Sequence, residues 1–272
     1  MSTAPGTELP PAIQIKMALS KASKTLSVGM DYVADDAMKM LSPTELSILS
    51  MQLRKSKVSA IWTNQVLAVK GLVQEQQSAR GNFPGPVPII YHGPIEHIAD
   101  AMAAGATAIA LDATLVDRVV AGDIFLLPPT EVIWKVSSLQ DVQAVMKATE
   151  NKADAFLFPQ TVSTETVQSI VQAIQERNVL WIATVPSMLP DGDEVIQGRS
   201  YKKAGISSIL VHQGCVGDAE DLAYTRFVVD GLTGKASSEF KFSGLTGSTN
   251  GHFGGIQAAG KISWKRQVDR RP

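Results

Sequence analysis

The 272-residue chain has a single cysteine, Cys215, so it cannot form an internal disulfide. Disulfides are rare in reducing compartments, and we therefore expect a soluble intracellular protein of the cytoplasm or an organelle stroma. No apolar run reaches the roughly 18 residues that a membrane-spanning helix needs. The first residues, MSTAPGTELPP, lack the basic segment and apolar core of a secretory signal.

An excess of charge is also missing, because the formal net charge is −1. This balance predicts neither a nucleic acid nor an anionic membrane as a partner. Hydrophobic residues make up 44% of the chain and charged residues 19%, which is enough apolar mass for one large core. A single barrel domain of about 250 residues fits this length.

Two segments of the chain share one pattern. AMAAGATAIALDAT (101–114) passes from helix-forming residues through Gly105 into a short apolar run, and KAGISSILV (203–211) does the same through Gly205. A glycine after a helix favours the left-handed cap conformation, and the apolar run is typical of a strand buried on both faces. The pattern predicts parallel strands joined by helices, and it suggests an old duplication of half of the fold.

Eight segments are candidate strands, separated by roughly 20–30 residues, which is the length of a βα unit. Helical patterns lie between them, such as residues 163–177, where Val167, Ile170, Val171 and Ile174 share one face. The pattern predicts an α/β protein with a (βα)8 TIM barrel, and an open doubly wound sheet is the alternative. The predicted strands are 26–30, 58–63, 87–92, 107–112, 131–136, 154–159, 179–184 and 207–212.

The chain divides into three predicted parts. Residues 1–25 form an N-terminal extension, in which residues 11–24 are an amphipathic helix that caps the barrel floor. Residues 26–234 form the barrel. Residues 235–272 form an irregular C-terminal tail that is rich in glycine and serine and shows neither a helical nor a strand period.

The order of these elements resembles the indole-3-glycerol phosphate synthase family. AAGATAIAL is similar to the turn between that family's third helix and fourth strand, and LSPTELSILSMQLRKSKVSAIWTN to its first helix and second strand. EVIWKVSSLQDV and KAGISSILV are similar to the fifth strand with its helix and to the approach to the eighth strand. The resemblance extends over residues 11–234 and implies a TIM barrel with an N-terminal helical extension.

The resemblance also implies a set of catalytic residues, and this chain lacks them at the corresponding strands. The family carries Glu and Lys on the first strand, Lys on the third, Glu on the fifth, Asn on the sixth and Glu on the seventh. This chain has no Glu from 9 to 44 or from 177 to 193, no Lys from 71 to 134 and no Asn from 152 to 177. At the fifth strand Lys135 replaces the carboxylate. We therefore predict a diverged member that lacks the family's activity.

Polar residues at the predicted strand ends are the candidates for a site, because barrel enzymes place their sites there. Lys135 is a candidate Schiff-base nucleophile, and the alternative is an ion pair with Asp112 that plugs the barrel. His92 and His212 are further candidates, but no close-spaced pair such as HxH supports a metal, and no cofactor is predicted. The strand-end residues are Asp31, Thr63, Tyr91, His92, Asp112, Lys135, Gln160, Thr184 and His212.

The loop after the eighth strand is a candidate phosphate site, because it holds Gly214 and Gly217 before a final helix. This predicts a small phosphorylated ligand. Against it, His212 stands where the family has a glycine, and Cys215 in the same loop is predicted to be an ordinary thiol. Acidic residues that would repel an anion follow the seventh strand, namely Asp191, Asp193 and Glu194.

The tail combines aromatic and basic side chains, a composition that disordered segments usually lack. We therefore predict that it docks onto a protein partner. Two functions remain open: an inactive barrel that serves as a structural or regulatory subunit through its tail, and a lyase-like barrel enzyme with altered active-site residues. The predicted partner-binding residues are Phe240, Phe242, Phe253, Trp264, Lys265 and Arg266.

Overall fold

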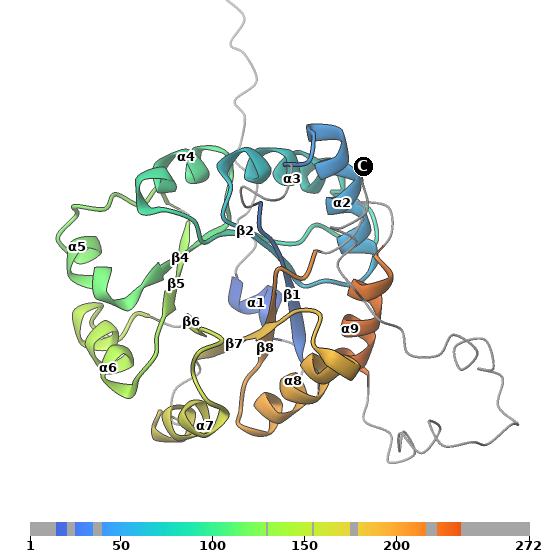
Figure 1. The fold of residues 1–272 in the computed structure, drawn as a ribbon. Coiled ribbons are helices and arrows are strands. Elements are labelled where there is room, and N and C mark those ends of the chain that lie inside the picture. The colour runs from blue at the N-terminus through green and yellow to red at the C-terminus, as the bar shows by residue number, and fades with distance from the viewer. Residues whose placement is uncertain are drawn as a thin grey trace, which may run out of the picture.

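The chain folds as a closed (βα)8 barrel, seen along its axis in Figure 1. The computed structural model describes residues 15–20, 25–34, 40–128, 130–153, 155–174, 179–215 and 222–234. The tail from 235 to 272, with its predicted partner-binding residues, lies outside these ranges, as does Gly217. Within them, no helix is long and apolar enough to cross a membrane.

Strands and helices alternate along the whole barrel. The strands are β1 (Ser27–Tyr32), β2 (Ala60–Thr63), β3 (Ile89–Tyr91), β4 (Ala108–Asp112), β5 (Glu131–Lys135), β6 (Ala155–Phe158), β7 (Leu180–Pro186) and β8 (Ser208–His212). The helices are α1 (Ile15–Leu19), α2 (Pro43–Lys55), α3 (Val66–Ser78), α4 (Ile98–Ala103), α5 (Val116–Val120), α6 (Leu139–Ala148), α7 (Thr164–Ala173), α8 (Asp193–Lys203) and α9 (Ala223–Thr233).

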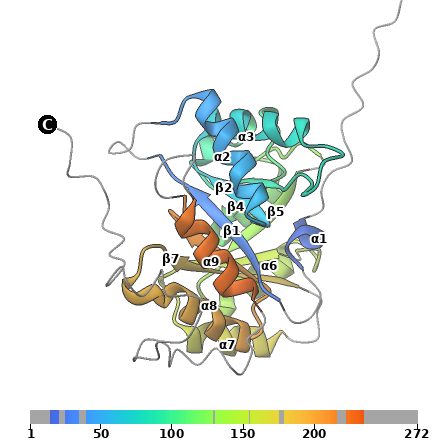
Figure 2. The same cartoon turned by 90° about the vertical axis from the view of Figure 1, so that its right-hand side faces the viewer.

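Each of the eight predicted strands overlaps an observed strand, and all neighbouring strands pair in parallel. The predicted alternative, an open doubly wound sheet, is wrong because β1 also pairs with β8 and closes the ring. The last helix, α9, packs against β1, and Figure 2 shows the two side by side. Helix α7 buries Val167, Ile170 and Val171, as its period predicts, whereas Ile174 follows the helix and is only half-buried.

The two glycine units take the predicted conformation. Gly105 follows α4 with φ 99° and Gly205 follows α8 with φ 96°, so both are left-handed caps. The two environments also match, because a Cβ on either glycine would lie 2.9 Å from a valine Cγ1 of the preceding helix, Val73 in α3 or Val171 in α7. The two units stand four βα repeats apart, which is half of the barrel.

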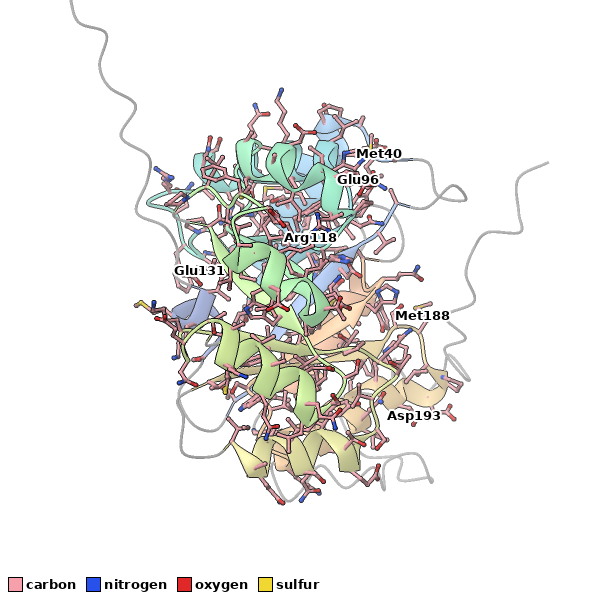
Figure 3. The ribbon with its side chains drawn as sticks, turned by 90° about the vertical axis from the view of Figure 1, so that its left-hand side faces the viewer. Met40, Glu96, Arg118, Glu131, Met188 and Asp193 are labelled. Carbon is pink, nitrogen blue, oxygen red and sulfur yellow. The ribbon has the colours of Figure 1, made fainter. Side chains whose placement is uncertain are left out.

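Helix α1 closes the N-terminal end of the barrel, which we call the floor. Its Ile15 and Leu19 belong to the apolar cluster that fills the barrel interior. Two hydrogen bonds fix the helix: Ser27 Oγ donates to the Leu19 carbonyl at 2.7 Å, and the Ile15 amide donates to Glu131 Oε2 at 2.9 Å. Figure 3 shows the labelled Glu131 on the side of α1. The prediction of a floor-capping helix is thus confirmed over 15–19.

Side chains alternate between the two faces of each strand, and this alternation divides the strand residues into two sets. One set lies under the helices and forms the outer core, and the other points toward the axis. At the C-terminal ends of the strands the inner set becomes polar, and we call this end the mouth. Its residues are Asp31, His92, Asp112, Lys135, Thr184 and His212.

Candidate functional site

Six of the nine predicted strand-end residues belong to the inner set, and three do not. Tyr91 packs in the outer core and donates its hydroxyl to the Pro94 carbonyl at 3.2 Å. Thr63 Oγ1 accepts a hydrogen bond from the Gln65 amide at 3.2 Å. Gln160 follows β6 and is exposed, out of phase with the inner residues of that strand. The period of two explains all three differences, since each residue is displaced by one from the inner set.

The mouth is organised around Asp31, which is fully buried at the end of β1. His92 Nε2 lies 2.7 Å from its Oδ1, and His212 Nδ1 lies 2.7 Å from its Oδ2. The Gln213 amide adds a longer contact of 3.4 Å to Oδ2. The structure thus places one buried carboxylate between the two imidazoles that the sequence analysis selected separately.

Electrostatics keep this carboxylate ionised. Burial alone would raise the pKa of Asp31, but hydrogen bonds from His212 and His92 and their positive charge lower it to about 2. An ionised carboxylate only accepts hydrogen bonds, so both imidazole nitrogens that face it carry a proton. This fixes the tautomers and leaves Nε2 of His212 and Nδ1 of His92 as the nitrogens available for other contacts.

His212 is the more accessible of the two imidazoles. Its side chain is 36% exposed, against 16% for His92. The hydrogen bond to Asp31 raises the pKa of His212 above its ordinary value of 6.5, and partial burial opposes this shift without cancelling it. His212 is therefore partly exposed and holds its proton more tightly than a free imidazole.

Packing beneath the mouth holds His92 in place. The indole ring of Trp62, which is buried in the barrel interior, lies 6.2 Å from the imidazole between ring centroids. The indole occupies space that Gly29 leaves free, because a Cβ at Gly29 would lie 2.6 Å from the indole Nε1. A close approach of this kind requires glycine, so Gly29 supports the site without contacting its polar groups.

The backbone after β8 is strained where it meets Asp31. Gln213 has a φ of 49°, a left-handed conformation that costs a non-glycine residue about 1 kcal/mol or more. This conformation lets the Gln213 amide reach Asp31. The next residue but one, Cys215, donates its amide to the Asp31 carbonyl at 3.2 Å. Burial raises the pKa of the Cys215 thiol, so the thiol stays protonated at neutral pH.

Lys135 and Asp112, which pair in register on β5 and β4, do not form an ion pair. Lys135 Nζ donates to the His92 carbonyl at 3.3 Å, and Asp112 accepts from the amide and hydroxyl of Thr114 at 2.9 and 2.6 Å. Among the ion pairs of the described residues, none within 4 Å includes Lys135. Burial lowers the pKa of Lys135, although the charges of Asp112 and Asp31 oppose this shift.

Gly214, one of the two predicted phosphate-site glycines, lies just after β8. The Gly214 amide donates to the Val211 carbonyl at 3.1 Å, and a Cβ on Gly214 would lie 2.7 Å from the Met30 sulfur. Of the three acidic residues after β7, Asp191 and Asp193 are exposed, whereas Glu194 is buried in α8. Figure 3 shows the labelled Met188 and Asp193 of this region at the end of the barrel opposite to α1.

Two imidazoles and a carboxylate are side chains that commonly bind metal ions. Within the described ranges, no group of three or more His, Cys, Asp or Glu side chains has an arrangement that could hold a metal ion. His92 and His212 each contact Asp31 through one ring nitrogen.

Asp31 is the central residue that the sequence analysis did not select, although it placed Asp31 among the strand-end residues. The signal was available: Asp31 follows an apolar strand in phase with Gly29, and a carboxylate buried at such a position must be paired. Its partners come from β3 and β8, far away in the sequence, so only the closed barrel identifies them.

Comparison with known proteins supports the fold. A solved structure described as native KDPGal has a TM-score of 0.54 and 9% sequence identity, over 76% of this chain and 92% of that chain. The N-acetylmannosamine-6-phosphate 2-epimerase from Clostridium perfringens has a TM-score of 0.50 and 12% identity, over 76% and 93%. No protein-family model matches the chain, and no curated protein matches its sequence. At such identities the likeness is one of fold, the TIM barrel.

Proposed function

We propose that the chain is a TIM-barrel enzyme, of the lyase or isomerase type, that moves protons on a small metabolite bound at the mouth. The observation that carries this proposal is the buried Asp31 carboxylate between His92 and His212. A carboxylate that fixes the tautomer of an imidazole leaves the opposite ring nitrogen free to give and take a proton. His212 is the general acid and base, and Asp31 is its positioning residue.

The properties of His212 suit this role. A raised pKa increases the fraction of imidazolium at neutral pH, and a general acid must hold such a proton before it donates it. Partial exposure gives a ligand access, whereas full burial of Asp31 keeps water away from the positioning hydrogen bond. General acid–base catalysis by such a group contributes about 10²–10⁴-fold to a rate.

We further propose descent from the scaffold of the indole-3-glycerol phosphate synthases without their reaction. Where that family carries lysine on the third strand and glutamate on the fifth, the inner positions of the mouth are His92 and Lys135. The reversed charge at the end of the fifth strand would stabilise a different transition state. Purified protein should not turn over the family's carboxyphenylamino-deoxyribulose phosphate, and growth of a synthase-deficient tryptophan auxotroph on this gene would contradict the proposal.

A phosphorylated substrate is the finer part of the proposal. TIM barrels commonly bind phosphate with the loops after strands seven and eight. Gly214 and Gly217 both stand in the loop after strand eight. The epimerase of similar fold is named for a phosphorylated sugar, which is an analogy of fold only. The Gly214 amide already donates to Val211, so a phosphate would depend on other amides of the same loop.

Exchange of carbon-bound protons with D2O tests the proposal. Proton NMR of dihydroxyacetone phosphate, dihydroxyacetone and pyruvate should show faster loss of the protons next to the carbonyl with the wild-type protein than without it. Asp31→Asn should reduce this rate by about 100-fold or more, because the imidazole loses its fixed tautomer. Asp123→Asn, the same change on an exposed residue, should leave the rate unchanged. Equal rates for wild type and Asp31→Asn would overturn the proposal.

A second function, an inactive barrel that serves as a structural or regulatory subunit, is favoured by one observation. None of the catalytic groups that the family resemblance implies stands at the mouth. The predicted attachment is the tail, whose Phe240, Phe242, Phe253 and Trp264 would carry most of the binding energy. Replacing these four by alanine should abolish capture of a protein partner, whereas neutralising Lys265 and Arg266 should mainly change its salt dependence. Proton exchange at the mouth would exclude inactivity.

A further inference from the structure

Lys135 is the one primary amine among the six mouth residues, and it lies at the end of β5 in phase with the barrel interior. Its Nζ donates to the carbonyl of His92, the residue whose imidazole binds Asp31. The amine is therefore held at the mouth by the backbone of His92, whose imidazole binds the same carboxylate that positions His212.

The neighbouring carboxylates do not neutralise this amine by direct contact. Both carboxylate oxygens of Asp31 accept hydrogen bonds from imidazoles, and Oδ1 of Asp112 accepts one from the Thr114 hydroxyl. A lysine that only filled the barrel would gain most from a close carboxylate, since a partly buried cation without one is costly. Burial lowers the pKa of Lys135, which increases the fraction of neutral amine at neutral pH.

We infer that Lys135 is the nucleophile of this site and that its substrates are small aldehydes or ketones, which it binds covalently as an imine. The inference rests on the proposed acid–base function, because imine formation needs a proton donor within the same site. It narrows the substrate from a small metabolite to a carbonyl compound.

The step balances with the groups present. The neutral Nζ attacks the carbonyl carbon, the C–N bond forms as the C=O π bond breaks, and a proton moves from the nitrogen to the oxygen to give a neutral carbinolamine. The imidazolium of His212 supplies the proton with which the hydroxyl leaves as water, and the C–O bond breaks. The product is an iminium ion and a neutral imidazole. That imidazole then accepts a proton from the carbon next to the iminium, which is the proton that exchanges with D2O.

Trapping by borohydride tests the inference on the full chain. Sodium borohydride delivers a hydride to the C=N bond and converts an imine into a stable secondary amine. We would incubate the protein with pyruvate, dihydroxyacetone phosphate or glycolaldehyde, reduce it, and locate the adduct by peptide mass spectrometry. With at least one probe, labelling of Lys135 should exceed that of the exposed Lys147 by about 10-fold or more.

Two variants separate a nucleophile from a packing residue. Lys135→Met keeps the length of the side chain without the amine, and it should lose the adduct and reduce proton exchange by about 100-fold. Lys147→Arg should change neither. A Lys135→Cys protein treated with bromoethylamine regains an amine of nearly the same length, and recovery of the adduct would show that the amine itself is needed.

The outcomes for the two proposals differ. Proton exchange that requires Asp31 but gives no adduct at Lys135 with any probe would overturn the imine and leave the acid–base function standing. Labelling of Lys135 that does not exceed labelling of Lys147 would also overturn the imine and leave the acid–base function standing. Loss of both exchange and adduct in the wild-type protein would overturn both proposals.

Discussion

The two ends of this barrel treat polar groups in opposite ways. At the floor, Glu131 and Ser27 bind the backbone of α1, and Ile15 and Leu19 fill the remaining space. At the mouth, His92 and His212 each bind Asp31. The floor therefore uses its polar groups to hold a helix, and the mouth pairs its titratable groups with one another.

In this fold, residues at one end of the barrel mainly stabilise it, and residues at the other end set the protonation states of titratable groups. An apolar plug contributes free energy through burial, which is indifferent to pH. A buried carboxylate between imidazoles contributes stability that depends on pH, and it sets protonation states. Changes at the floor should therefore lower stability at every pH, and changes at the mouth should affect proton transfer and the pH dependence of stability.

The largest expected effect is on the rate at the mouth. Asp31→Asn should lower proton exchange by about 100-fold or more and leave the fold intact, because the amide keeps the shape of the carboxylate. Circular dichroism and the exchange rate would be measured on the same sample. Loss of folded structure in this variant would instead assign Asp31 to stability and weaken the contrast between the two ends.

The next effect belongs to the floor. Leu19→Ala should lower the free energy of unfolding by about 2–5 kcal/mol, because it empties a fully buried site in the barrel interior. Met17→Ala in the same helix should stay within about 0.5 kcal/mol, since Met17 is 75% exposed. Urea unfolding gives both values. Proton exchange below the unfolding transition should be normal in both variants, and a loss in Leu19→Ala alone would couple the two ends.

A smaller effect is the pH dependence of stability at the mouth. The pKa of Asp31 is lowered from 3.8 to about 2, so its contribution is present above pH 4 and lost as the pH falls toward 2. The pKa of His212 is raised above 6.5, so its contribution is present below that pH and lost as the pH rises through its raised value. Both contributions are present together between about pH 4 and 6.5.

The stability difference between wild type and Asp31→Asn should therefore be largest in that window, at about 2 kcal/mol from the carboxylate alone. Urea unfolding at pH 3, 5 and 9 would measure it. The difference should shrink at both outer values, and a difference that does not change with pH would contradict the electrostatic account.

The smallest effect is expected for the tail. The barrel from β1 to α9 is closed by the described residues, with Tyr224, Val228 and Leu232 of α9 buried. Removing residues 235–272 should therefore change the thermal midpoint by only a few degrees. Calorimetry of both proteins would show it. Unfolding of the shortened chain would mean that the tail is part of the core, and the prediction of a docking segment would fail.

The sequence was sufficient for the fold and insufficient for the site, and the reason is the range of the interactions. The glycine after each of α4 and α8 and the apolar runs that follow are local signals, and they predict the βα units correctly. The contacts of Asp31 join β1 to β3 and β8 across 61 and 181 residues. No local pattern encodes them. Tyr91 was wrongly assigned to the mouth, because neighbouring residues at a strand end point to opposite faces of the sheet and the inner residue here is His92.

The state of His212 is the measurement closest to the central claim, because the account depends on Asp31 holding this imidazole. The chain has four histidines, which makes an NMR titration of ¹⁵N-labelled imidazoles tractable. In the wild-type protein the pKa of His212 should lie above 6.5, and Asp31→Asn should return it toward 6.5. A pKa of His212 that is the same in both proteins would contradict the account.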